Sequence, residues 1–246
     1  MLLKNMKRSI KKYSDKFVFA AELQHRLAGV GIDSLCMKMY SHDDDVDLVV
    51  INSQKYSQAA DVLRIDDWKL NNNKSKIRER DKDFFSHDQQ KYKIHLHAYF
   101  SWNTVPYLDS SVLWSRKRKE QQVFLPSLED ELLIIAVHSL FENMCIVPEE
   151  IYYGKNILKN KIDYGYLKSQ AGRFHWESGL ELIRNKLNNN DSQIAASELL
   201  AIRINKLFSD IFQVGFGQIV NEMFAYFFID WVWCYPKRHK KLYVAT

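Results

Sequence analysis

The pattern of hydrophobic and polar positions changes its period near residue 125 of this 246-residue chain. Before that point, short apolar runs with the two-residue period of β-strands alternate with helical segments. After it, apolar residues recur mainly with the spacing of amphipathic helices. The pattern predicts an α+β fold, with a small mixed β-sheet domain over residues 1–120 and an all-helical domain over residues 121–246.

In the first half, the apolar positions predict an αββαββ order of elements. A stripe of Phe19, Leu23 and Leu27 at i, i+4 and i+8 marks the first helix, and glycines mark its end. The last two strands are expected to form a hairpin. The predicted elements are a helix over residues 15–28, strands over 33–40 and 45–51, a helix over 53–64, and strands over 77–85 and 91–102.

In the second half, the stretch "PSLED" is a helix start, with Ser127 as N-cap and Asp130 placed for a capping-box contact. The apolar positions that follow predict one amphipathic helix as far as Met144. Further helices are predicted over residues 149–159, 176–187, 192–208 and 219–232.

Composition narrows the classes of protein. A hydrophobic content of 46% supports a sizeable core, and a formal charge of +5 permits a polyanionic partner without demanding one. The three cysteines lie far apart without CxxC pairing, so a reducing cytoplasm is the expected compartment. The most apolar run, residues 223–235, is too short to span a bilayer. We interpret it as a buried helix and expect no membrane partner, with an interfacial membrane helix as the alternative.

Four residues could carry chemistry together. Asp45 and Asp47 are two apart at the start of a strand, so both carboxylates lie on one face, and His95 and His97 do the same on a later strand. If the two strands are neighbours, carboxylates and imidazoles converge. Carboxylates suit Mg²⁺ or Mn²⁺, and imidazole shifts the preference toward Mn²⁺ or Zn²⁺. The alternative is a polar turn that leads into a core strand.

The order of these parts resembles the nucleotidyltransferase superfamily with the DNA polymerase β-like fold. "DVDLVV" (residues 45–50) stands in the place of that superfamily's D-x-D strand. "KIHLHAYF" (residues 93–100) is similar to a later strand of a poorly characterised nucleotidyltransferase group, with His95 in the place of an aspartate. "LPSLEDELLIIAVHSLFE" resembles that group's next helix, which often carries a histidine where this chain has His138. The resemblance covers residues 17–142.

The resemblance implies a nucleotidyltransferase-like domain and a metal-dependent activity. An NMP group would move from an NTP substrate to a hydroxyl acceptor on a small molecule, a protein or RNA, with a divalent metal (Mg²⁺ or Mn²⁺, with Zn²⁺ as a third choice) neutralising the phosphates. Asp45, Asp47 and His95 would be catalytic. The metal ligands would be Asp45, Asp47, His95 and His97.

This sequence departs from the superfamily pattern at two points. The Gly-Ser turn that cradles a triphosphate is replaced by "KMYSHDD" (residues 38–44), which has no glycine. Lys38 as a point charge, with Ser41, is the candidate phosphate contact there. Arg116 and Arg118, in the basic stretch "WSRKRKEQQ", are further candidate nucleotide contacts, unless that stretch is a solvated linker. His95 replaces an acid, and a neutral imidazole weakens magnesium binding.

Functions other than nucleotidyl transfer stay open. A catalytically inactive relative that binds nucleotide, nucleic acid or a partner protein in regulation is the main alternative, and a basic nucleic-acid-binding module is a third. His138, within an apolar helix, is interpreted as a structural histidine. The sequence has no P-loop, no G-x-S-x-G and no H-E-x-x-H, so P-loop NTPases, α/β-hydrolases and zincins have no support.

Overall fold

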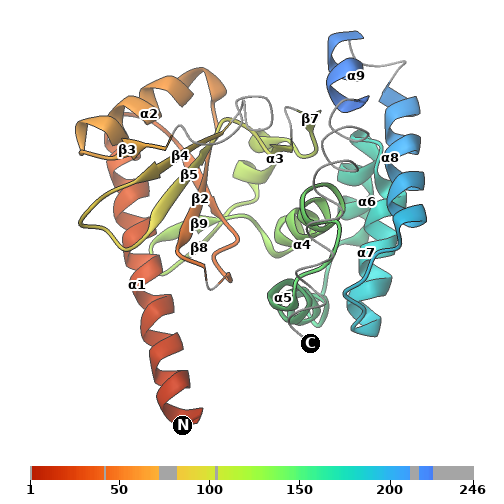
Figure 1. Cartoon of the computed structure of the whole chain (residues 1–246), viewed down its shortest axis with the longest axis horizontal. Coiled ribbons are helices and arrows are strands. Elements are labelled where there is room, and N and C mark those ends of the chain that lie inside the picture. The colour runs from red at the N-terminus through yellow and green to blue at the C-terminus, as the bar shows by residue number, and fades with distance from the viewer. Residues whose placement is uncertain (1, 42, 72–81, 103–104, 211–215, 224–246) are drawn as a thin grey trace. The chain divides into compact units, whose positions relative to one another are not determined.

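A computed structural model describes residues 2–41, 43–71, 82–102, 105–210 and 216–223 (Figure 1). It confirms the α+β prediction, because it combines helices with a five-stranded mixed sheet. Contacts group the chain into two compact units. Of the described residues, the first unit comprises those within 1–74, 81–100 and 109–127, and the second comprises those within 101–108 and 128–223. This grouping describes packing, and the functional boundary near residue 120 stays a prediction.

The sheet of the first unit has the order β1-β2-β5-β4-β3. β2 and β5 pair in parallel, and the other neighbours are antiparallel. The predicted hairpin between the last two strands is confirmed by the β4–β5 pair, whereas the short β3 was not predicted. The strands are β1 (Ser34–Met37), β2 (Asp45–Val50), β3 (Lys69–Leu70), β4 (Lys82–Ser86) and β5 (Lys93–His97).

One face of this sheet is apolar and packs against two helices. Val46, Leu48 and Val50 of β2 join the buried cluster formed with α1 (Leu2–Gly29) and α2 (Tyr56–Ile65). A short turn of 3-10 helix precedes α2. Because side chains alternate along a strand, the acidic residues of β2 lie on the opposite face. The helix α1 begins well before the predicted residue 15.

A second hairpin completes the first unit. The helix α3 (Ser110–Ser115) is capped by Asp109 and leads into β8 (Arg118–Glu120) and β9 (Val123–Leu125). The basic stretch that ends in this hairpin is therefore not a solvated linker. Gln24 of α1 holds the hairpin, because its Nε2 donates to the carbonyl oxygens of Ser34 and Phe124, at 2.9 and 3.0 Å.

Among its described residues, the second unit has named strands only in the short pair β6 (Ser101–Trp102) and β7 (Val105–Pro106), and its other named elements are helical. The helix start after Pro126 is confirmed, but the regular helix ends at Val137 and a π-helical turn, η2, follows. Its helical elements are α4 (Leu128–Val137), η2 (His138–Asn143), α5 (Pro148–Leu158), α6 (Tyr164–Arg173), α7 (Glu177–Asn189), α8 (Ala196–Asp210) and α9 (Phe216–Met223).

The core of the second unit forms around α4, which packs against α5, α6 and α7. The Trp176 indole is fully buried and donates to the Tyr107 carbonyl oxygen at 3.2 Å, and the Tyr107 ring stacks on Phe141. The predicted helix over residues 219–232 and the apolar run over 223–235 lie mostly outside the described residues. Within the described part of the chain, no helix is both long and apolar enough to cross a membrane.

Candidate functional site

The parallel pairing of β2 with β5 brings acidic and imidazole side chains to one face of the sheet. The register places Asp47 opposite His95, and Val49 opposite His97. Asp45, two residues before Asp47, lies on the same face. The sequence predicted this convergence only if the two strands were neighbours, and in the structure they are.

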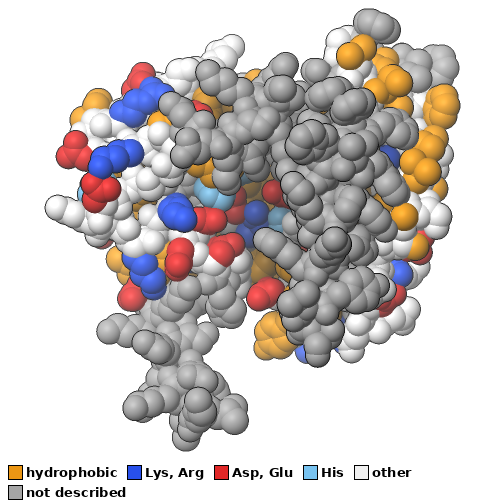
Figure 2. Space-filling view, in the orientation of Figure 1, with side chains coloured by type: hydrophobic (Ala, Val, Ile, Leu, Met, Phe, Trp, Pro, Cys, Tyr) orange, Lys and Arg blue, Asp and Glu red, His pale blue; other side chains and the backbone are white. Residues whose placement is uncertain are grey.

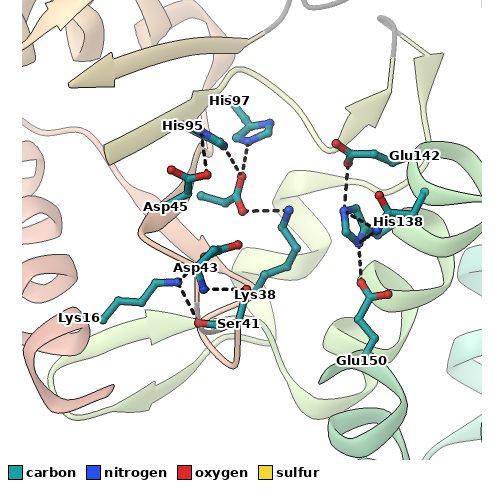
Figure 3. Close-up of polar contacts among 12 residues, drawn as sticks. Lys16, Lys38, Ser41, Asp43, Asp45, His95, His97, His138, Glu142 and Glu150 are labelled. Atoms are coloured by element: carbon teal, nitrogen blue, oxygen red, sulfur yellow. Dashed lines mark hydrogen bonds and ion pairs between the residues drawn. The ribbon is translucent and has the colours of Figure 1, made fainter. Parts of the chain in front are cut away.

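His95 lies between the two carboxylates (Figure 3). Its Nε2 is 3.4 Å from Asp45 Oδ2, and its Nδ1 is 3.4 Å from Asp47 Oδ1. His97 Nε2 is 3.0 Å from the same Asp47 oxygen. The ring of Phe84, from the neighbouring β4, meets the His95 ring edge-on with centroids 4.2 Å apart, which fixes the orientation of the imidazole.

Lys38 supplies the positive charge of this group. Its Nζ is 2.9 Å from Asp47 Oδ2. Lys38 follows β1 directly and has a φ of 51°, in the left-handed region that glycine adopts easily and other residues rarely adopt. The Ser41 amide donates to the Lys38 carbonyl oxygen at 2.9 Å and closes the turn. We call Asp45, Asp47, His95, His97 and Lys38 the sheet cluster.

The carboxyl group of Asp47 stays ionised within the sheet cluster although the residue is only 5% exposed. Burial alone would raise the pKa of Asp47, but the Lys38 ammonium and the hydrogen bonds with His95 and His97 hold that pKa well below its usual range. Asp47 is therefore a buried anion that depends on its neighbours.

Sequence reasoning missed one residue beside this cluster. Lys16 of α1 is 3% exposed, and its Nζ contacts Asp43 Oδ1 at 3.0 Å and the Ser41 carbonyl oxygen at 3.2 Å. The Ser41 hydroxyl accepts from the Asp43 amide at 3.3 Å. One signal was available, because Lys16 precedes the buried Ala20 by one helical turn and so falls on the core face of α1.

The two predicted arginine contacts lie at the end of α3 and on β8. Arg118 forms an ion pair with Glu120 on the same strand, β8. Arg116 ends α3, where its amide donates to the Leu113 carbonyl oxygen at 3.3 Å. Neither contact involves the sheet cluster, so a role for these arginines in nucleotide binding stays a prediction.

The sheet cluster suits a divalent ion in donor type but not in its present arrangement. Adjacent donors around an ion with bonds of about 2.1 Å lie about 3 Å apart, close to the observed spacing of carboxylate and imidazole atoms. However, no group of three or more His, Cys, Asp and Glu among the described residues is arranged to hold a metal. Both Asp47 oxygens are engaged, one by imidazoles and one by Lys38.

The Lys38 ammonium also opposes a second cation at Asp47. Two like unit charges about 4 Å apart repel by about 4 kcal/mol at an effective dielectric constant near 20, and a divalent ion doubles that figure. As folded, the sheet cluster is therefore a set of internal ion pairs.

A second histidine–carboxylate group lies in the second unit. His138 Nδ1 pairs with Glu150 of α5, and His138 Nε2 is 3.4 Å from Glu142 Oε2 (Figure 3). Glu150 is 1% exposed, and its Oε2 accepts from the Ser139 hydroxyl and the Val147 amide, both at 3.3 Å. We call His138, Glu142 and Glu150 the helical cluster. Its buried carboxylate joins η2 to the start of α5, which favours the structural interpretation of His138.

The first unit also contains a cavity of about 430 Å³ between α1 and the β8–β9 hairpin. Trp114 and Phe124 give it a mainly apolar lining, and Ser34 lies on its wall. Ser34 opens β1, whereas Met37, the partner of Asp47 in the register, closes it. The cavity is thus separate from the sheet cluster. We place the candidate site at the sheet cluster, because ionisable groups converge there.

Charged side chains of both signs lie on the surface of the first unit that Figure 2 shows. On the face of the first unit seen in Figure 2, acidic and basic side chains of the described residues are interspersed. A continuous basic surface, which nucleic-acid binding favours, is not visible among them in this view.

Comparison with protein families, curated proteins and solved structures finds no match for this chain.

Proposed function

We propose that the chain is a protein of the nucleotidyltransferase superfamily, with a nucleotidyltransferase-like domain before residue 120 and a helical domain after it, and that the sheet cluster is its nucleotidyl-transfer site. The observation that carries this proposal is the position of His95 between Asp45 and Asp47, 3.4 Å from each carboxylate. Two strands far apart in the sequence supply these groups, which agrees with a D-x-D strand paired to a strand that bears a third ligand.

In this proposal a divalent metal supplies the charge that neutralises the NTP phosphates. The chain's own residues do the rest. Asp45 and Asp47 would provide two anionic metal ligands. His95 would take the place of the superfamily's third ligand, and His97 contacts Asp47. Lys38, next to the turn that ends at Ser41, provides a point charge for phosphate oxygens where a glycine-rich turn is missing.

A second candidate is a catalytically inactive relative that binds nucleotide. Two observations favour it: Lys38 forms an ion pair with Asp47, and the acidic and imidazole groups of the described residues include no group of three or more arranged to hold a metal. Such a protein would bind an NTP through Lys38 and would need no divalent ion.

The experiment uses NTPs labelled at the α-phosphate, Mg²⁺ or Mn²⁺, and a cell extract as the source of hydroxyl acceptors. Transfer of label with release of pyrophosphate is expected, and Asp45→Asn and Asp47→Asn should each lower it at least about 100-fold. Asp61→Asn, an exposed aspartate on α2 paired with Arg64, is the matched control and should leave transfer unchanged.

Thermal-shift measurements separate the two candidates. Stabilisation by an NTP in EDTA, without label transfer under any condition, would support the inactive relative. No stabilisation by any NTP, with or without metal, would contradict both candidates.

A further inference from the structure

We propose that Lys38 is a built-in competitor of the metal: its ammonium holds the cation position beside Asp47 in the metal-free protein, and a divalent ion binds only when Lys38 leaves. This inference rests on the proposed function of the sheet cluster and concerns how that site is switched.

The contacts of Asp47 support exclusive occupation. One oxygen faces His95 and His97, and the other is 2.9 Å from Lys38 Nζ. Asp47 is only 5% exposed, and each of its two oxygens already has a partner. A metal that binds Asp47 must therefore take the place of the ammonium.

The local charge leads to the same conclusion. Asp45 and Asp47 carry two formal negative charges, and Lys38 cancels one of them. A divalent ion cancels both, and would leave Lys38 as an uncompensated charge beside another cation in a partly buried site. Exchange of the two cations avoids this repulsion, whereas their coexistence does not.

The backbone at Lys38 is a separate observation. A lysine with a φ of 51° adopts a conformation that costs free energy and that glycine would adopt without strain. Such a residue persists where the side chain has a use that outweighs the strain. The flexible four-carbon stem lets the ammonium move from Asp47 to a phosphate oxygen while the turn stays in place. Metal binding and phosphate contact would then be coupled through one side chain.

The test measures Mn²⁺ alone, without nucleotide, by electron paramagnetic resonance of the free ion in titrations of the full chain. Lys38→Met should lower the Kd for Mn²⁺ at least about tenfold relative to the unchanged protein, because the competing cation is removed. Adding Asp47→Asn to Lys38→Met should abolish the gain. No gain with Lys38→Met would overturn the inference.

Lys16→Met is the matched control, because it removes the same charge from a lysine that pairs with Asp43 rather than with Asp47. It should change the Kd less than about threefold. If Lys16→Met and Lys38→Met tighten Mn²⁺ binding equally, the effect comes from the overall negative electrostatic potential of the region. That result would also overturn the inference.

A second measurement needs no substitution. Reductive methylation of lysines, followed by mass spectrometry, should label Lys38 at least about threefold faster in saturating Mn²⁺, while Lys16 keeps its rate. Unchanged labelling of Lys38 would contradict the exchange. A Mn²⁺ gain in Lys38→Met without any label transfer from NTP would uphold the inference and count against the transfer proposal. Label transfer from NTP without tighter Mn²⁺ binding in Lys38→Met would support the transfer proposal and overturn the inference.

Discussion

The sheet cluster and the helical cluster both combine histidine with carboxylate side chains, but the buried carboxylate has different further partners in each. In the helical cluster, the buried carboxylate of Glu150 contacts His138, a hydroxyl and a backbone amide, all of them groups that join two helical segments. In the sheet cluster, the buried carboxylate of Asp47 contacts two imidazoles and a lysine with a strained backbone. A second carboxylate, Asp45, is partly exposed beside it.

The difference supports the proposal that the sheet cluster, rather than the helical cluster, is the functional site. The Val147 amide that donates to Glu150 lies at the start of α5 and cannot leave it without a change of the backbone there, so that cluster is part of the fold. In the proposed exchange, the Lys38 side chain leaves Asp47 by rotation about its side-chain bonds, and the sheet cluster changes its partner. Histidine beside carboxylate is not a functional signal by itself; the third partner, a backbone amide in one cluster and a lysine side chain in the other, separates the two cases.

The largest expected effect is on the stability of the helical cluster. Glu150→Ala leaves the His138 imidazole, the Ser139 hydroxyl and the Val147 amide without their acceptor, and should lower the free energy of unfolding by about 3 kcal/mol in urea titrations. Glu142→Ala, which removes a partly exposed carboxylate 3.4 Å from the same imidazole, should cost less than about 1 kcal/mol. Equal losses would remove the structural distinction between these carboxylates.

A smaller loss of stability is expected in the sheet cluster, with a defined pH dependence. Because the folded pKa of Asp47 is held below its ordinary value, the ionised group stabilises the fold above about pH 4, and this contribution disappears as the pH falls through the folded pKa. Asp47→Asn should therefore cost about 2 kcal/mol at about pH 7. The difference from the unchanged protein should shrink below about pH 4. A difference that grows in acid would contradict the ionised state of Asp47.

The third prediction concerns the choice of metal. His95→Asp gives the third position the carboxylate of the superfamily pattern, and the added negative charge should tighten Mg²⁺ binding about tenfold in competition with Mn²⁺. His95→Asn has a similar size to aspartate without the charge and serves as the control. If both variants bind Mg²⁺ equally, charge at residue 95 does not select the metal.

The smallest expected effect tests the support of His95. Phe84→Leu removes the edge-on ring contact and should weaken Mn²⁺ binding about threefold by loosening the imidazole. Phe19→Leu, which removes a ring contact with Trp68 elsewhere in the first unit, should leave Mn²⁺ binding unchanged. A loss of the same size in both variants would indicate a general effect on packing.

The sequence was sufficient to predict which side chains share a face of each strand. It was not sufficient to predict the charged contact that completes the site. The two-residue period predicted that Asp45 and Asp47 share one face of their strand and that His95 and His97 share one face of theirs. The parallel pairing of the two strands brings all four side chains to the same face of the sheet. Lys38 was a candidate by its charge alone. Its contact with Asp47 depends on a left-handed backbone that lysine rarely adopts and that no residue pattern predicts.

Other elements were missed for related physical reasons. The β8–β9 hairpin turns through Gln121 and Gln122, both with positive φ, where two-residue turns normally use asparagine, aspartate or glycine. The end of regular α4 at Val137 lies within an unbroken apolar period, so the sequence predicted one continuous helix. In each case the observed backbone departs from the local preference of the residues.

The central claim, that the sheet cluster binds a cation and nucleotide through exchange with Lys38, is tested most directly by diffraction. Crystals grown with Mn²⁺ and a non-hydrolysable NTP would be measured for the anomalous signal of manganese. We predict a manganese peak bonded to oxygens of Asp45 and Asp47, with Lys38 Nζ moved from Asp47 to a phosphate oxygen. A nucleotide bound elsewhere, or manganese bound at Asp47 with Lys38 still paired to it, would contradict the account.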